Sequence, residues 1–283
     1  VVNIDGEVVA LNAGAARSAA SSFFLPLDRI DRALQEIRSG REVTRGTLQT
    51  TFQSKPFDEL RRLGLTPESE RLARLEGEEQ TSMLAVDQVI PNSSAAGKIA
   101  PGDILIRING QMITEFVPLG ATLDSKVGEE IEIEVERGGR HIVQMITVED
   151  LHAITPDEYL EFGDGIVNTL SYQQARHYNR QASGVYVANP GYLLSKAAIP
   201  RGAVIVEMDG EPMENLDDFE AVLNELADGE RVTVRYVNME NPQNSVVRLL
   251  EMDRVWFPVK RCIRDDDTGA WPCRILAAGP ESP

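Results

Sequence analysis

The pattern of apolar and polar positions repeats once along the chain, about a hundred residues apart. A run of mostly Ile, Leu, Val and Met stands between two glycines at residues 102–110 and again at residues 202–210. Each run has the length of a buried strand and ends in Asn-Gly or Asp-Gly, a strong short-range signal for a hairpin turn. The sequence therefore predicts a buried strand and a tight turn at both places.

Two further elements follow the hairpin in both copies. Apolar residues at helical spacing occupy residues 116–123 and 219–226, and a polar residue, Thr114 or Asn215, precedes each stripe. We expect these polar residues to cap the two helices. A glycine and an alternating strand come next in each copy. Three elements in the same order predict a tandem of two similar units.

Glutamate occupies every second position of the alternating strand in the first copy, from Glu130 to Glu136. Ile and Val fill the positions between them. This alternation predicts a half-buried strand, with the glutamates on its solvated face.

Composition narrows the class of protein. A length of 283 residues with 42% hydrophobic content suffices for about two ordinary cores. A formal net charge of -17 disfavours nucleic acid and anionic lipid as partners, and leaves basic or neutral apolar peptides. No apolar run approaches the roughly 20 residues of a membrane helix, so we expect no membrane insertion. The chain opens at Val1 without Met, as expected for a fragment or processed product.

Weaker patterns surround the first copy. Residues 1–12 predict a hairpin around Asp5-Gly6, residues 14–22 a loop, and residues 27–37 a helix that stops at Gly40. Residues 57–65 and 67–75 have helical spacing.

The second copy has its own flanking signals. Residues 151–157 are expected to lead into a short helix, and residues 170–178 into another. From residue 256 to residue 283 the signals weaken into turns and a Gly/Pro tail. Cys262 and Cys273 flank a turn there, and either close a disulfide or remain thiols.

Catalytic machinery is not recognisable in the sequence. His141, His152 and His177 form no constellation, and each is expected to be a surface or locally hydrogen-bonded residue. The sequence has no Gly-x-Ser-x-Gly elbow, phosphate loop or His-Glu-x-x-His motif. We therefore expect no catalytic residue, cofactor or metal in this chain.

Several motifs resemble one family. Residues 102–110 resemble the central strand of PDZ domains, residues 91–96 the preceding loop of bacterial-type PDZ domains, and residues 43–50 the opening of the PDZ domain in HtrA/Deg serine proteases. The likeness is closest to the subgroup of the fungal nuclear HtrA-like protease and its bacterial relatives. The residues that carry this likeness are 45–50, 55–58, 151–156, 170–176 and 264–269.

The resemblance implies an α+β fold in four parts. Residues 1–42 would be the last strands and closing helix of a trypsin-like β-barrel protease domain, 43–150 a PDZ domain, 151–255 a PDZ-like domain, and 256–283 a C-terminal extension. Each PDZ-type domain would be a small, partly open β-barrel or sandwich capped by helices. The catalytic serine would lie a few residues before Val1, so the chain alone would be inactive although its parent protein would be an endopeptidase.

The resemblance also implies a binding mechanism, in which an extended peptide adds as a strand to a sheet edge and loop N–H groups hold its C-terminal carboxylate. The implied peptide-binding residues are Arg45, Gly46, Thr47, Leu48, Gln49, Thr50, Phe116, Leu119 and Leu123. Arg45 would add a positive charge near the carboxylate.

Two departures qualify this hypothesis. Gln49 stands where related loops usually have glycine, and would distort the loop if glycine's backbone angles are needed. In the first unit, Leu48, Phe116, Leu119 and Leu123 either line a competent groove or fill the core. In the second unit, Asp164 stands where a ligand's carboxylate would lie, which favours a scaffold or domain-contact role.

The resulting hypothesis is a peptide-binding, regulatory PDZ region of an HtrA-like endopeptidase that serves protein quality control. Its partners would be substrate polypeptides or C-terminal peptides and its upstream protease domain, through which it would form homo-oligomers. A free-standing tandem PDZ adaptor and a purely structural scaffold are the alternatives. The periplasm or envelope of bacteria and the eukaryotic nucleus are both open as locations.

Overall fold

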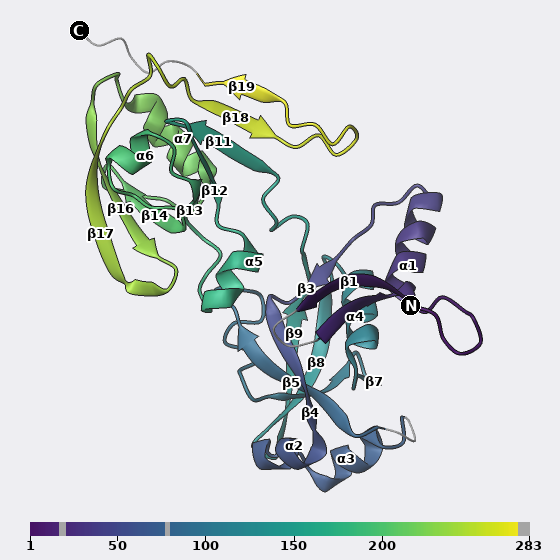
Figure 1. The fold of residues 1–283 in the computed structure, drawn as a ribbon. Coiled ribbons are helices and arrows are strands. Elements are labelled where there is room, and N and C mark those ends of the chain that lie inside the picture. Colours follow the sequence, from purple (N-terminus) through teal and green to yellow (C-terminus); the bar gives the residue numbers. More distant parts are fainter. Residues whose placement is uncertain (17–20, 77–79, 277–283) are drawn as a thin grey trace. The chain divides into compact units, whose positions relative to one another are not determined.

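The computed structural model describes residues 1–16, 21–76 and 80–276, which divide into two compact units, Val1–His152 and Ala153–Pro283. Both units combine helices with antiparallel sheets, so the α+β fold is confirmed (Figure 1). Among these residues, every helix is too short or too polar to span a membrane.

The first unit contains the first copy of the repeat. Its elements are β1 (Ala10–Ala16), β2 (Ser21–Pro26), α1 (Leu27–Arg38), β3 (Gly46–Thr47), β4 (Thr50–Pro56), α2 (Phe57–Leu63), α3 (Pro67–Ala73), β5 (Ser82–Val89), β6 (Ile104–Ile108), β7 (Gln111–Met112), α4 (Phe116–Ser125), β8 (Glu130–Arg137), β9 (Arg140–Thr147) and β10 (Glu149–Asp150).

The main sheet of the first unit has the strand order β4-β5-β6-β8-β9. Strand β6 is the predicted buried strand, and it lies at the centre of the sheet. The hairpin after it is confirmed, because Asn109 and Gly110 both have positive φ, as a tight two-residue turn requires. Among the described strands, β4 and β9 are the edges of this sheet.

Two apolar clusters cover the two faces of this sheet, and β6 contributes to both. Ile104 and Ile106 pack in the cluster that includes Phe57 of α2, while Leu105 and Ile108 pack in the cluster that includes α4. Successive side chains of a strand point to opposite faces, and both faces of β6 are covered. This explains why the strand is apolar apart from Arg107, whose guanidinium pairs with Glu134 at 2.8 Å.

The two repeat helices begin differently. Helix α7 (Leu216–Glu225) has the predicted cap, because Asn215 accepts the N–H groups of Asp217 and Asp218 in a capping box. Helix α4 does not, since its N-cap is Glu115 and no side chain caps it. The prediction that Thr114 caps this helix was wrong by one position.

One glutamate of the alternating strand is buried, contrary to prediction. Glu136 has 0% of its surface exposed. Its carboxylate accepts the N–H of Thr66 at 2.9 Å and the hydroxyls of Thr66 and Ser69 at 2.7 Å, and Nε2 of His141 lies 2.8 Å away. Because α3 begins at this point, its unpaired donors and helix dipole stabilise a negative charge.

The second unit contains the second copy. Its elements are β11 (Glu158–Phe162), β12 (Gly165–Thr169), α5 (Tyr172–Ala175), the 3-10 helix η2 (Arg176–Tyr178), β13 (Val185–Asn189), α6 (Leu193–Lys196), β14 (Ala203–Met208), β15 (Glu211–Pro212), α7, β16 (Arg231–Asn238), β17 (Asn241–Glu251), β18 (Lys260–Ile263) and β19 (Cys273–Ile275). The sheet has the order β17-β16-β14-β13-β12-β11-β18-β19.

Two segments of the second unit differ from the prediction. The chain enters this unit as strand β11 rather than as a short helix, and β18 and β19 replace the expected turns after residue 256. Strand β18 pairs with β11, while a disulfide between Cys262 and Cys273 joins β18 to β19. The disulfide is one of the two alternatives that the spacing left open.

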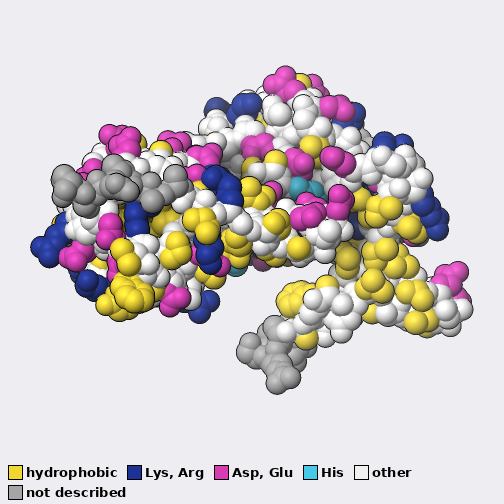
Figure 2. All heavy atoms as spheres, turned by 90° about the horizontal axis from the view of Figure 1, so that it is seen from above, with side chains coloured by type: hydrophobic (Ala, Val, Ile, Leu, Met, Phe, Trp, Pro, Cys, Tyr) yellow, Lys and Arg dark blue, Asp and Glu magenta, His cyan; other side chains and the backbone are white. Residues whose placement is uncertain are grey.

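The N-terminal segment forms a hairpin of its own in the first unit. The expected turn at Asp5-Gly6 is present, with a bridge between Val2 and Val8. The predicted loop at residues 14–22 is wrong where the structure describes it, because Gly14 to Ala16 belong to β1, which pairs with β2. Side chains such as Phe23 and Phe24 are exposed there, and Figure 2 shows apolar side chains gathered on this projecting arm.

Candidate functional site

The loop at residues 45–50 packs against the C-terminal end of α4. A Cβ atom added to Gly46 would lie 2.1 Å from the carbonyl oxygen of Leu123, so only glycine fits at this position. Strand β3 pairs with β10 on its other side. The structure thus brings the predicted loop residues together with the end of the predicted helix.

A buried carboxylate, that of Asp124, lies at this junction. Its Oδ1 accepts the N–H of Gly46 at 2.9 Å. The guanidinium of Arg32, on α1, lies 3.4 Å from the same carboxylate and that of Arg45 lies 3.9 Å away. Arg29 also lies near this carboxylate. Its burial, and then the charge of Arg45, lower the pKa of its guanidinium. The charge of Arg45 therefore already faces an acid of the chain itself.

Gln49 keeps the backbone conformation for which glycine is usually required. Its φ is 49°, in the left-handed region. The Gln49 side chain donates to Glu149 at 2.5 Å, and its backbone N–H donates to the hydroxyl of Thr47 at 2.9 Å. Gln49 therefore does not distort the loop, because local hydrogen bonds hold the left-handed residue in place.

The outer edge of β4 has unpaired backbone groups among the described strands. Val86 of β5 exchanges hydrogen bonds with the chain at β6, through Asp103 and Gly102. Its partner in β4, Phe52, therefore points its N–H and C=O away from β5, and by alternation so does Ser54. This edge is a template for an added strand.

The predicted apolar wall is mostly buried. Leu48, Leu119 and Leu123 are 1%, 5% and 7% exposed and belong to one core cluster. Phe116, at the start of α4, is 50% exposed. Three of the four side chains therefore help to build the core, and Phe116 alone among them is open to a partner.

The second unit covers the corresponding edge with its own chain. Strand β12 is the counterpart of β4, and β11 pairs with it from Leu160 to Phe162. Gly163 and Asp164 both have positive φ and form the turn between the two strands. The loop that could have held a carboxylate is therefore a tight hairpin turn.

Side chains of β11 also fill the space against α7. Leu160 and Phe162 are fully buried in the core, and the ring of Phe162 meets the ring of Phe219 edge-on, with centroids 5.5 Å apart. Aromatic pairs favour this arrangement. The chain itself thus provides the strand and the apolar side chains that a ligand would bring.

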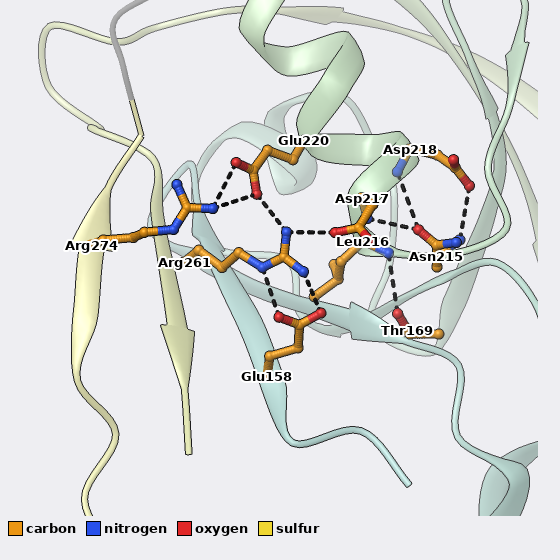
Figure 3. A network of polar contacts seen from close by, with 9 residues as sticks. All are labelled: Glu158, Thr169, Asn215, Leu216, Asp217, Asp218, Glu220, Arg261 and Arg274. Atoms are coloured by element: carbon orange, nitrogen blue, oxygen red, sulfur yellow. Dashed lines mark hydrogen bonds and ion pairs between the residues drawn. The ribbon is translucent and has the colours of Figure 1, made fainter. Parts of the chain in front are cut away.

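A charged network fastens β11 and β18 to α7 (Figure 3). Arg261 of β18 donates to Glu158 of β11 at 2.7 Å, and to Glu220 of α7 at 2.7 Å, while Asp217 lies 2.7 Å away. These hydrogen bonds, led by the one to Glu158, raise the pKa of Arg261. Arg274 of β19 adds a second contact to Glu220 at 2.9 Å.

Asp124 and Glu149 are parts of the first site that were not predicted from the sequence. Asp124 stands in the last turn of α4, where the helix dipole disfavours a negative charge. An acid at such a position is a signal that tertiary partners stabilise it. Glu149 gave no comparable signal, because its partners Gln49 and Ser94 are distant in sequence.

Comparison with protein families matches both units. Residues 53–136 match the PDZ domain family and residues 153–229 match the PDZ-like domain family. The two matches define the chain as a tandem PDZ protein.

Known relatives make the assignment more specific. The chain is 43% identical over 279 residues to the pro-apoptotic serine protease nma111 of Aspergillus fumigatus, which covers 98% of this chain and 27% of that protein. It is 40% identical over 287 residues to Protease Do-like 7 of Arabidopsis thaliana, covering 97% and 26%. Among solved structures, an HtrA-type protease, AlgW with a decapeptide, aligns at 25% identity and a TM-score of 0.33, over 51% of this chain and 42% of that chain.

The chain therefore carries tandem PDZ domains, and it is similar over nearly its whole length to the corresponding part of HtrA/Deg-type serine proteases. It spans about a quarter of the length of these curated relatives.

Proposed function

We propose that the first unit binds an extended peptide as an added strand on the outer edge of β4. PDZ domains bind peptide ligands in this mode. The observation that carries the proposal is the contrast between the units, since the edge of β4 is unpaired among the described strands whereas that of β12 is covered by β11. Phe116, exposed at the start of α4, is the apolar side chain that we expect to contact the peptide.

In the whole protein, this binding would present segments of substrate polypeptides to an upstream protease domain as part of protein quality control. Residues 43–150 would be the PDZ domain that reads the segment, and residues 151–255 a PDZ-like brace. Homo-oligomers would form through the protease domain. Support comes from the family and from α1, whose Arg32 donates to the carbonyls of Asp124 and Thr44 and so fastens α1 to residues 43–150.

A peptide library tests the strand-addition step. Random decapeptides are screened against the full chain, and the strongest binder is measured by fluorescence anisotropy. We expect Ser54→Pro to weaken this peptide about tenfold, because proline removes an outward N–H without breaking the β4–β5 ladder. Phe116→Ala should weaken it as well.

Ser54→Ala is the matched control, since it keeps the N–H and should bind within about twofold of the unaltered chain. Circular dichroism of each variant checks that the unit remains folded. If folded Ser54→Pro binds as well as the unaltered chain, or if the library has no binder, strand addition at β4 is refuted.

A further inference from the structure

The loop that would hold a peptide's C-terminal carboxylate already has internal partners. Capture of a carboxylate needs several successive backbone N–H groups pointing at one place. In the first unit these donors would come from residues 48–50. The middle one, the N–H of Gln49, donates to Thr47 Oγ1 at 2.9 Å. The run of free donors is therefore interrupted.

Two carboxylates of the chain, those of Asp124 and Glu149, lie on either side of this loop. The N–H of Gly46 donates to the buried carboxylate of Asp124, which also draws the guanidinium of Arg45. On the other side, the carboxylate of Glu149 accepts from the Gln49 side chain at 2.5 Å and from the N–H of Ser94 at 2.8 Å. A ligand's carboxylate would approach two negative charges and would find Arg45 already engaged.

The edge of β4 has no such internal partner among the described strands. The backbone groups of Phe52 and Ser54 that point outward recognise main chain alone and do not need a chain end. Recognition by strand addition is thus separable from recognition of a terminus.

From these contacts we infer that the first unit selects internal extended segments of unfolded polypeptides, and that a free C-terminal carboxylate adds little to its affinity. Thr47 and Glu149 are the residues that set this preference. The inference rests on the proposed function, because it names the ligand class for the same edge of β4.

The test compares two forms of one peptide. The strongest decapeptide from the library is synthesised with a free C-terminal carboxylate and with a C-terminal amide, and both dissociation constants are measured with the full chain. We expect the amide to bind within about fivefold of the acid, because a fully formed carboxylate site of charged hydrogen bonds would give a larger ratio.

Two conservative variants should shift the preference of the first unit from internal segments toward free C-termini. Thr47→Val keeps the shape of the side chain and releases the N–H of Gln49, while Glu149→Gln removes a charge and keeps an amide oxygen for Ser94. Each should strengthen the free acid about threefold to tenfold and leave the amide unchanged. The second variant covers the case in which the first fails to fold.

The outcomes separate the two proposals. If the acid binds the unaltered chain more than about fivefold tighter than the amide, or if neither folded variant changes the ratio, the inference is wrong while strand addition stands. If Ser54→Pro has no effect on either peptide form, the proposed function itself fails.

Discussion

On folding, the carboxylate of Glu136 loses its contacts with water. It gains hydrogen bonds from Thr66 and Ser69 and a contact with the ring of His141. Such a buried acid is stabilising only while every partner is present, because an unpaired donor in the interior costs free energy. The connection between β8 and the start of α3 therefore depends on one side chain.

Glu136→Gln tests this connection. The amide keeps the size of the side chain but removes the charge that the start of α3 stabilises and replaces one acceptor oxygen by an N–H donor, so we expect the free energy of unfolding to fall by about 2 kcal/mol. Glu132→Gln, at an exposed position of the same strand, should change it by less than about 0.5 kcal/mol. Urea denaturation measures both, and equal stability of the two variants would contradict the role given to Glu136.

Glu70 makes the first unit sensitive to acid. Hydrogen bonds from Arg61, and then from Arg74, lower its pKa from 4.5 to about 2. Because the folded pKa is depressed, its stabilising contribution is complete above the ordinary pKa and is lost as the pH falls from 4.5 toward about 2.

Glu70→Gln should therefore be less stable than the unaltered chain by about 1 kcal/mol at neutral pH, since both arginines are half exposed. The difference should shrink below about pH 4 and vanish near pH 2. Urea denaturation at a series of pH values measures it, and a difference that stays constant down to pH 2 would refute the assignment.

At the scale of elements, the second unit depends on how β11 and β18 are held. Neither strand packs by apolar contacts alone, because Arg261 of β18 is surrounded by Glu158, Asp217 and Glu220. Removing this cation takes the arginine from Glu158 in a partly buried place and leaves Glu220 with Arg274 alone.

Arg261→Met should lower the free energy of unfolding of the second unit by about 3 kcal/mol. Arg231→Met is the comparison, because Arg231 pairs with Glu251 at the surface and its loss should cost less than about 1 kcal/mol. Tryptophan fluorescence during guanidinium unfolding follows the second unit, since Trp256 and Trp271 both lie in it. Similar losses in both variants would argue against the network as a fastening.

Elements fixed by neighbouring residues could be predicted from the sequence, and elements fixed by distant ones could not. The hairpin at Asn109-Gly110 and the cap at Asn215 depend on a few adjacent positions. Strand β11 depends on its pairing with β18, a hundred residues later, and both strands are too short for periodicity to reveal them.

The candidate site shows the same division. The helix carrying Phe116 was predicted from the spacing of its apolar residues, and the loop 45–50 by resemblance. The acids Asp124 and Glu149, which decide what that loop has left to offer a ligand, are brought there only by the fold.

On the scale of the whole molecule, stability should be uneven along the chain. Among the described strands, β1 pairs only with β2, and Leu11, Phe23 and Phe24 are exposed on this hairpin, whereas β6 is buried at the centre of its sheet. Backbone hydrogen bonds near solvent open easily.

Hydrogen exchange at residues 1–16 should therefore be at least about a hundredfold faster than at residues 104–108. Mass spectrometry of the full chain resolves the two segments. Equal protection would show that this hairpin is held by more than its own pairing.

The covered edge of β12 in the second unit limits how strongly the chain can hold a long polypeptide. With β11 seated beside β12, the described residues leave open only one of the two corresponding edges, that of β4, so binding at this edge should follow a one-to-one stoichiometry. A substrate with two matching segments gains no avidity from the tandem, because effective concentration multiplies affinity only when two sites are open. Such a gain requires several chains held in one assembly, which makes the number of chains, rather than the number of PDZ units, the quantity that sets retention.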